Sequence, residues 1–228
     1  GQLEEASEQK QQFIDNFSHE LRIPLTAIYG YAEYIQKAFM SEEERYECTQ
    51  FIMSECSRLQ NMAYQLLDMA LLRRDEMKDS DCSVKELFAE SEKVMHVRAS
   101  EKKIKLTYAL SPNYVVRGNM EQLLILLNNL IDNAIKASRQ EDEIHIRAYA
   151  EESAVVMEVR DHGAGMEKEQ ISHIKEAFYR VDKARSRAGG GAGLGLAICE
   201  RIIQLHHADM SFVSEPGAGT TVKLSFPV

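Results

Sequence analysis

Apolar residues recur at alternating spacings of three and four along the first third of the chain. This period is typical of helices that pack along one stripe against a neighbouring helix. Ser41 precedes three glutamates and predicts a helix start, because serine caps free N–H groups and acids favour the positive end of the helix dipole. We therefore predict two long helices in an antiparallel hairpin. The first stripe is Ile14, Phe17, Leu21, Ile28, Tyr31 and Ile35, with Pro24 among them, and the second is Ile52, Cys56, Leu59, Ala63, Leu66 and Ala70.

A hairpin of two helices cannot bury both of its faces by itself. Pairing of two copies into a dimeric four-helix bundle would cover the apolar face that remains. The sequence therefore predicts a homodimer, with residues 1–78 as its dimerisation domain.

The pattern changes near Asp81, where short runs rich in β-branched and aromatic residues alternate with helical stretches. This order favours an α/β sandwich with helices on one face of a sheet. We assign residues 82–228 to this second domain, so the whole chain is α+β. The predicted strands are 104–110, 114–117, 144–149, 154–160, 210–213 and 221–226, and the predicted helices are 84–101, 120–138 and 194–205. The polar segment 167–193 is predicted to be a long loop that acts as a lid.

Composition narrows the classes of function. The net charge of −9 argues against a nucleic-acid surface, which needs clustered lysine and arginine. The four cysteines show no paired spacing, which indicates reduced thiols in a cytoplasmic compartment. No run reaches the ~18 apolar residues of a membrane span. Because Gly1 lies within a helical pattern, we expect a fragment whose sensor or membrane segment lies outside this chain.

His19 and Glu20 form a polar pair on the outer side of the first helix. A neutral imidazole has a pKa near ~6.5, so one nitrogen is free to attack an electrophile at neutral pH. The adjacent carboxylate could accept the proton from the other nitrogen. Pro24 removes a helical hydrogen bond to the carbonyl of residue 20 and predicts a distortion of the kind that functional sites retain. The alternative is a solvated pair on a helix surface.

Asn129, Asn133 and Lys136 follow one another at spacings of four and three, so they share one face of a predicted helix. Two amide oxygens and an ammonium could hold hydrated Mg²⁺ and a polyphosphate, because Mg²⁺ prefers oxygen ligands. The alternative is a polar helix edge with capping roles.

Two glycine clusters carry the remaining candidate chemistry. In 161–165, an aspartate at a strand end could accept from the exocyclic amine of adenine, and the glycines let backbone pass close to a flat ring. An ordinary turn is the alternative. In 191–196, glycines open a helix whose N–H groups form an anion site. This segment lacks the Gly-Lys-Ser/Thr of a P-loop and the last glycine of a dinucleotide fingerprint, so it is a phosphate loop of another kind.

In this order, the motifs resemble those of bacterial two-component sensor histidine kinases, in their dimerisation and catalytic core. The resemblance spans essentially the whole chain. The matching segments are 13–25 for the H box, 129–133 for the N box, 161–165 and 191–196 for the two glycine boxes, 178–180 for the F box of the lid, and 219–220 before the last strand.

The resemblance implies roles for single residues. His19 would be the phosphoacceptor and Glu20 its general base. Asn133 would be the main Mg²⁺ ligand, with Asn129 nearby, and Asp161 would accept from adenine. The ATP-binding set would be Asn129, Asn133, Lys136, Asp161, Gly163, Gly165, Phe178, Tyr179, Arg180, Gly191, Gly193, Leu194, Gly195, Leu196 and Thr220, with Lys136 and Arg180 on the phosphates.

The implied reaction moves the terminal phosphate of ATP to His19 and then to an aspartate in the receiver domain of a separate response regulator. Positioning and charge neutralisation would supply most of the catalysis. The catalytic region would lie in the cytoplasm, with the parent protein anchored in the cell membrane by a segment outside this chain. The dimer permits attack within one chain or across the pair.

Two other functions compete with this one. A silent scaffold that binds nucleotide would not need the intact His19 and Glu20. A related ATPase or chaperone of the same superfamily would not need the heptad hairpin.

Ile23 departs from the family pattern. Four residues after the phosphoacceptor, the family usually carries Thr or Asn, which helps to place a water that removes phosphate from the regulator. Ile23 shares a helical face with His19 but neither donates nor accepts a hydrogen bond. We therefore expect weak or absent phosphatase activity. The alternative is that Ile23 belongs to a hydrophobic surface that faces the regulator.

Overall fold

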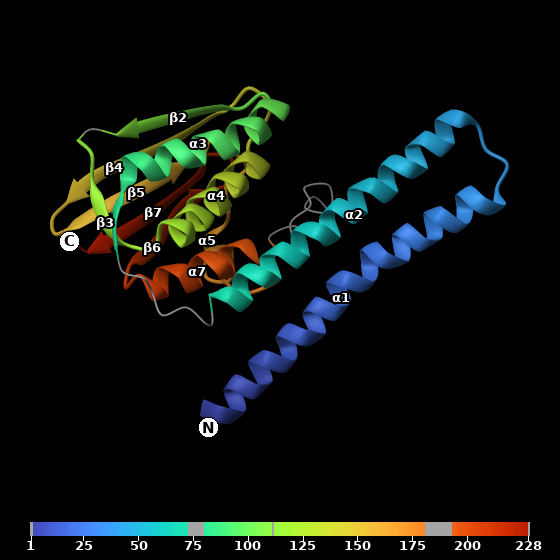
Figure 1. Ribbon diagram of the computed structural model, residues 1–228, viewed down its shortest axis with the longest axis horizontal. Helices are drawn as coiled ribbons and strands as arrows, with labels where there is room; N and C mark the ends of the chain where they lie inside the picture. Colours follow the sequence, from blue (N-terminus) through green and yellow to red (C-terminus); the bar gives the residue numbers. More distant parts are fainter. Residues whose placement is uncertain (1, 73–79, 111, 181–192, 228) are drawn as a thin grey trace.

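A computed structural model describes residues 2–72, 80–110, 112–180 and 193–227 of the protein. Two long helices, α1 (Gln2–Lys37) and α2 (Glu42–Leu71), form an antiparallel hairpin that projects from a sheet domain (Figure 1). Ser41 caps α2: its hydroxyl accepts from the N–H of Glu44, whose carboxylate accepts from the N–H of Ser41. The predicted hairpin is therefore confirmed. The helix α1 continues through the buried Pro24, so the predicted distortion does not interrupt it.

The contact seam on α2 differs from the predicted stripe. The side chains that are not exposed alternate by four and three through Cys48, Ile52, Glu55, Leu59, Met62, Leu66 and Met69. Cys56, Ala63 and Ala70 of the predicted stripe are exposed in the single chain, so the predicted stripe matches the seam within the hairpin only at Ile52, Leu59 and Leu66. The predicted stripe contains no glutamate, whereas Glu55 lies in the seam and forms an ion pair with Arg58 at 3.6 Å.

The sheet domain starts at β1 and combines a small two-stranded sheet with a larger five-stranded one. The elements are β1 (Ser80–Ser83), α3 (Val84–Glu101), β2 (Lys105–Leu110), β3 (Val115–Gly118), α4 (Met120–Ala137), β4 (Glu143–Glu151), β5 (Ala154–Arg160), α5 (Lys168–Ile171), α7 (Gly195–Leu205), β6 (Asp209–Glu215) and β7 (Gly219–Pro227). The large sheet has the order β2-β4-β5-β7-β6, with β2 parallel to β4 and the other neighbours antiparallel. β1 pairs with β3.

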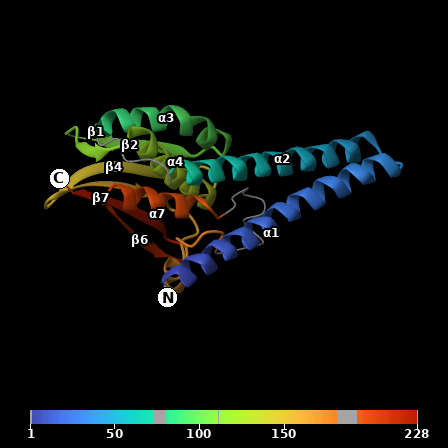
Figure 2. The same cartoon turned by 60° about the horizontal axis from the view of Figure 1, so that its bottom comes forward.

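The helices α3, α4 and α7 cover one face of the large sheet (Figure 2). The core lies between them and the sheet, where Leu123, Leu126 and Leu127 of α4 are fully buried. Met62 of α2 is also fully buried and belongs to the same core cluster, so the end of the hairpin packs against the sheet domain.

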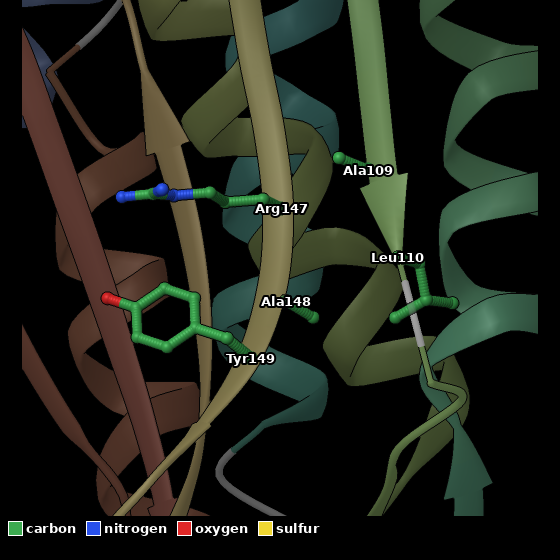
Figure 3. Close-up of a pocket in the computed structure, with 5 residues that line it drawn as sticks. All are labelled: Ala109, Leu110, Arg147, Ala148 and Tyr149. Carbon is green, nitrogen blue, oxygen red and sulfur yellow. The ribbon is translucent and has the colours of Figure 1, made fainter.

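A charged network covers the other face of the sheet. Glu158 of β5 is almost completely buried and accepts two hydrogen bonds from Arg147, at 2.8 and 3.0 Å, and one from the hydroxyl of Tyr149 at 3.3 Å. Arg147 and Tyr149 project from the same side of β4 and line a shallow hollow of about 470 Å³ with Ala109 and Leu110 (Figure 3). The bidentate pair compensates the buried charge, and none of these residues belongs to the predicted site.

Most predicted elements are confirmed, with ends shifted by at most two residues. β1 was missed because Ser, Asp, Cys and Ser have low strand propensity, and pairing with β3 determines its conformation instead. The prediction of a loop throughout 167–193 was wrong at its start, where Glu167 and Gln170 form a capping box for α5 and Ile174 is buried. Residues 181–192 of that segment lie outside the described residues.

All four cysteines are free, as predicted. Within the ranges that the structure describes, no helix has the length and apolar character needed to cross a bilayer.

Candidate functional site

His19 lies on the exposed side of α1, between Phe17 and Leu21, which pack against the core of the sheet domain. The neighbouring Glu20 is half-buried, and its Oε2 accepts a hydrogen bond from Arg58 Nη2 at 3.0 Å. The side chain of Arg58 is only 5% exposed, so α2 holds this guanidinium firmly against α1. The histidine is therefore open to a reactant, while its acidic neighbour is fixed by the hairpin.

The F box contacts α1 at the same place. Arg180 Nη1 lies 3.7 Å from Glu20 Oε2. The ring of Phe178 lies 5.1 Å from that of Phe13 and 6.5 Å from that of Phe17, measured between ring centroids. The segment that follows α5 thus joins α1 beside His19 through both an aromatic cluster and an ion pair.

The backbone of Phe178 explains how this contact is built. Its φ is +67°, a left-handed value that is unusual for a bulky residue and persists only where the surroundings determine it. Its N–H donates to the carbonyl of Gly193 at 2.9 Å. A side chain at Gly193 would lie 2.8 Å from the Phe178 backbone, so a glycine is required there. The F box therefore meets the residues just before α7, and Tyr179 stacks on His173 beside it.

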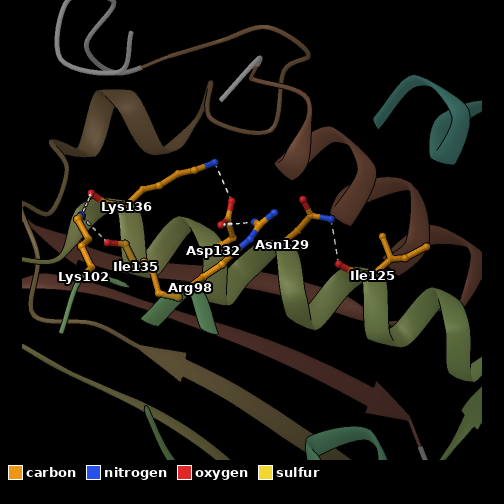
Figure 4. Close-up of polar contacts among 7 residues, drawn as sticks. All are labelled: Arg98, Lys102, Ile125, Asn129, Asp132, Ile135 and Lys136. Atoms are coloured by element: carbon orange, nitrogen blue, oxygen red, sulfur yellow. Dashed lines mark hydrogen bonds and ion pairs between the residues drawn. The ribbon is translucent and has the colours of Figure 1, made fainter. Parts of the chain in front are cut away.

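The N-box face of α4 lines a cleft with residues of α2 and α3. Asn119 caps α4 by accepting from the N–H groups of Glu121 and Gln122. At the other end, Lys102 donates to the carbonyl of Ile135 at 2.7 Å (Figure 4). It also donates to the carbonyl of Ser138 at 3.0 Å. Both caps satisfy backbone groups that a helix leaves open and fix the orientation of this helix.

Asn129 and Lys136 have defined partners on this face. Asn129 donates through Nδ2 to the carbonyl of Ile125 at 2.9 Å, which turns its Oδ1 toward Gly195 at the start of α7. Lys136 Nζ lies 2.7 Å from Asp132 Oδ2, and Arg98 Nη1 lies 2.6 Å from the other oxygen of Asp132 (Figure 4).

Asn133 is half-buried one turn beyond Asn129. Amide oxygens are suitable donors for Mg²⁺, and the helix places two of them one turn apart. Among the described residues, no group of three or more His, Cys, Asp or Glu side chains could hold a metal ion. The residues present therefore fit a magnesium ion that is shared with nucleotide phosphates and water.

Asp161 is buried at the end of β5, where its Oδ1 accepts from the N–H groups of Gly163 at 2.8 Å and Thr220 at 3.2 Å. Burial raises the pKa of Asp161, and the two backbone hydrogen bonds oppose this rise. One carboxylate oxygen is thus used by the loop, and the other has no hydrogen bond among the described residues. That arrangement suits a carboxylate which accepts from a ligand.

Close backbone contacts join the first glycine box to α4 and β7. A side chain at Gly163 would lie 2.4 Å from the carbonyl oxygen of Ala137, at the end of α4. Gly165 has a φ of +63°, and a side chain there would lie 1.9 Å from the carbonyl oxygen of Glu215. These glycines bring the strand end with Asp161 against the helix that carries Asn133.

The structure brings most of the predicted site residues together in two groups. One group joins Glu20 to the F box, and the other joins α4 to Asp161 and the glycine boxes. Leu194 is fully buried as the N-cap of α7, Gly195 and Leu196 begin this helix, and Thr220 contacts Ser214 at 2.9 Å between the hydroxyl oxygens. Gly191 lies outside the described residues. A cleft of about 760 Å³ between α2, α3 and α4 is lined by Asn129 and Lys136, together with Gln65 and Asp68 of α2, but not by Asp161.

Sequence reasoning missed the charged partners of the site. Arg58 binds Glu20, and Asp132 binds both Lys136 and Arg98. A signal for the first was available, since Glu55 stands at a heptad seam position and requires a cation beside it. The pair of Asp132 with Lys136 has the i, i+4 spacing of one helix and could have been found in the sequence, whereas the pair of Asp132 with Arg98 depends on the packing of α3 against α4.

Comparisons with known proteins agree with this geometry. Residues 9–75 match the family model of the His Kinase A (phospho-acceptor) domain, and residues 118–228 match that of the histidine kinase-, DNA gyrase B-, and HSP90-like ATPase. The sensor protein SrrB of Staphylococcus aureus is 32% identical over 222 residues, which cover 96% of this chain and 38% of SrrB. The phosphate regulon sensor protein PhoR of Pseudomonas aeruginosa is 30% identical and is covered to 51%. The chain thus spans about half or less of the length of these curated relatives.

Solved structures share the fold. Histidine kinase ThkA, in complex with the response regulator protein TrrA, has a TM-score of 0.78 at 20% identity over 99% of this chain and 66% of that chain. Full-length ShkA in complex with AMPPNP has a TM-score of 0.66 at 27% identity over 95% of this chain and 45% of that chain.

A paired-helix phosphoacceptor domain followed by an ATPase domain of this kind defines the core of a histidine kinase. The chain belongs to the family of two-component sensor histidine kinases.

Proposed function

We propose that this chain binds ATP, phosphorylates His19 and passes the phosphoryl group to an aspartate on a separate response regulator. The observation that carries the proposal is the contact of the F box with α1, where Arg180 and Phe178 of the ATP-binding domain lie beside Glu20 and the aromatic residues before it. The nucleotide-binding module and the phosphoacceptor thus share one surface.

The chemical step follows from the positions of His19 and Glu20. One imidazole nitrogen of His19 forms a bond to the γ-phosphorus of ATP, and the bond from this phosphorus to the bridging oxygen breaks, which releases ADP. The proton on the other ring nitrogen passes to the Glu20 carboxylate. The Arg58 side chain, 5% exposed, keeps that carboxylate next to the histidine.

Nucleotide binding is assigned to the residues that join α4, the glycine boxes and α7. Asp161 accepts from the adenine amine, and Asn133 with Asn129 holds Mg²⁺, which neutralises charge on the phosphates when bound. Lys136 and Arg180 would exchange their present partners, Asp132 and Glu20, for phosphate oxygens. The backbone at 193–196 supplies N–H groups at the start of α7. The remaining members of the set are Gly163, Gly165, Phe178, Tyr179, Gly191, Leu194, Leu196 and Thr220.

The hairpin supports a homodimer. Large apolar side chains along it remain exposed in the single chain, among them Leu25 at 54% and Leu67 at 55%. The exposed Cys56, Ala63 and Ala70 add a second line of small side chains on α2. A second copy would bury both, because two such hairpins form a four-helix bundle.

A response regulator is proposed as the partner for two reasons: the family works with one, and the solved structure of ThkA is a complex with the response regulator protein TrrA. The exposed part of α1 after His19 offers the surface on which a receiver domain could reach the phosphohistidine. The domains are proposed to divide at residues 1–78 and 82–228. We also propose that the catalytic region works in the cytoplasm, with the parent protein anchored in the membrane by a segment outside this chain.

The decisive experiment replaces His19 with Gln. Incubation with ATP labelled at the γ-phosphate should label the wild-type chain and leave His19→Gln unlabelled, while both bind a fluorescent ATP analogue equally. His96→Gln, at an exposed position on α3, is the matched control and should keep its label. Retained label on His19→Gln would refute the assignment.

Ile23 supports a further part of the proposal, weak phosphatase activity toward the regulator. Ile23 is half-buried, one turn after His19, and has no polar atom with which to place a water. Decay of a phosphorylated receiver domain should therefore be similar with and without this protein plus ADP, and Ile23→Thr should accelerate it. Fast decay with the wild-type chain would contradict the expectation.

A further inference from the structure

We propose that His19 is phosphorylated by the ATP-binding domain of its own chain rather than by that of the partner subunit. This inference rests on the proposed function and adds which of the two chains supplies the nucleotide. It matters because a four-helix bundle offers two histidines to each ATP-binding domain.

The question reduces to which α1 helix the F box contacts. In an antiparallel four-helix bundle, each α2 has two neighbours of the α1 type, one from its own chain and one from the partner. The ATP-binding domain follows α2, so it lies near both. The side of α2 on which it packs therefore decides which histidine it serves.

The F box packs on the α1 of its own chain. Phe178 contacts Phe13 and Phe17, and Arg180 lies 3.7 Å from Glu20. These three residues of α1 are spaced by four and three and form one line along the helix. His19 directly precedes the last of them, so the phosphoacceptor is next to the contact.

A second set of contacts holds the domain to its own α2. Met62 is fully buried in the core cluster of the sheet domain, and Gln65 Nε2 lies 3.9 Å from the position that a side chain at Gly195 would take. The start of α7, which is assigned to phosphate binding, is thus placed beside the same hairpin.

Arg58 links the two helices at this point. It is buried, donates to Glu20 at 3.0 Å and lies 3.6 Å from Glu55. The carboxylate of Glu20 therefore faces α2 and the F box of the same chain together. A partner chain is not needed to complete this cluster of charges.

A second copy can bind without displacing the F box. Ile14 and Leu25 are 45% and 54% exposed and are eleven residues apart, which is three helical turns, so they form a line of their own. That line is rotated by roughly a quarter turn from Phe13, Phe17 and Glu20, since each residue advances by ~100°. The dimer contact and the docked ATP-binding domain therefore occupy different faces of α1.

The test uses mixed dimers in which one chain is wild type and the other carries Asn133→Asp, which removes nucleotide use from that chain. The two chains carry different affinity tags and differ in size, so that only mixed dimers are purified and each chain is seen separately after labelling from γ-labelled ATP. We expect nearly all of the label on the wild-type chain. Label on the Asn133→Asp chain, alone or in equal amount, would overturn the inference.

A second mixed dimer pairs His19→Gln with Asn133→Asp. Here the only remaining His19 belongs to the chain without nucleotide use, and we expect no label. Both experiments are repeated with Asp161→Asn in place of Asn133→Asp, so that the result does not depend on a defect of one variant. Wild-type homodimers that fail to label would reject the proposed function itself, whereas labelled homodimers with label on the wrong chain would reject only this inference.

Discussion

Leucines in the two regions of this chain have contrasting environments. Leu123, Leu126 and Leu127 of α4 are fully buried between the sheet and its helices, whereas Leu25 and Leu67 of the hairpin expose more than half of their surface. Among the described residues of the hairpin, the buried apolar side chains are few and concentrate at its junction with the sheet domain, as Met62 and Leu72 do. The sheet domain is thus stabilised by its own core, whereas the hairpin leaves much of its apolar surface exposed in the single chain.

The largest expected effect separates these two kinds of leucine. Leu127→Ala should destabilise the sheet domain by roughly 2–5 kcal/mol, because it leaves a cavity in a closed core. Leu67→Ala should change the unfolding of that domain by less than about 0.5 kcal/mol and should instead weaken the dimer. Urea unfolding and sedimentation at several concentrations measure the two quantities. Equal losses of unfolding free energy in both variants would erase the distinction.

A pair of glycines sharpens the comparison. Gly165 has a φ of +63° and stands against the carbonyl of Glu215, so Gly165→Ala should cost about 1–3 kcal/mol and distort the loop beside Asp161. Gly30 is helical, with nothing within 4 Å of an added side chain, so Gly30→Ala should stabilise the hairpin by up to ~1 kcal/mol. Thermal unfolding and nucleotide titration report both. The same sign for the two variants would contradict the argument.

The smallest expected effect concerns pH. Burial raises the pKa of Asp161, so the folded chain holds this proton more tightly than the unfolded chain, and ionisation costs stability as the pH rises through that pKa. Asp161→Asn removes this cost and still offers an oxygen to the N–H groups of Gly163 and Thr220. Its melting temperature should exceed that of the wild type at neutral pH, and the gap should close toward about pH 4.

Nucleotide binding should move in the opposite direction for this variant. A hydrogen bond to a charged group contributes about 1.5–3 kcal/mol, so Asp161→Asn should bind ATP about tenfold more weakly or worse. Asp15→Asn, at an exposed position in the hairpin, is the control and should alter neither property. A wild-type chain that melts higher than Asp161→Asn at neutral pH would contradict the burial cost.

Much of the fold could be predicted from the sequence because its signals are local. The span of α3 follows from helical spacing, and the start of α2 follows from the cap at Ser41. β5 is apolar from Ala154 to Val159 except for Glu158, and its ends were predicted without error. Partners that depend on tertiary contact could not be predicted, as with β1, whose conformation comes from β3.

The candidate site shows the same division. Spacing alone placed Asn129 and Lys136 on one face and Asp161 at a strand end, as the structure has them. Two arginines that form ion pairs at the site lie far from their partners in sequence: Arg58 is 38 positions from Glu20, and Arg98 is 34 positions from Asp132. A pattern read along one helix carries no information about such pairs.

The left-handed Phe178 couples two parts of the molecule. Its N–H donates to the carbonyl of Gly193, just before α7, and its ring packs on Phe13 of α1. A twist of α1 would therefore change the energy of the backbone at Gly193, and a ligand that moves this backbone would bias the twist of α1 by the same free energy, because coupling between two sites is reciprocal. One aromatic side chain thus links the hairpin to the start of α7 in both directions.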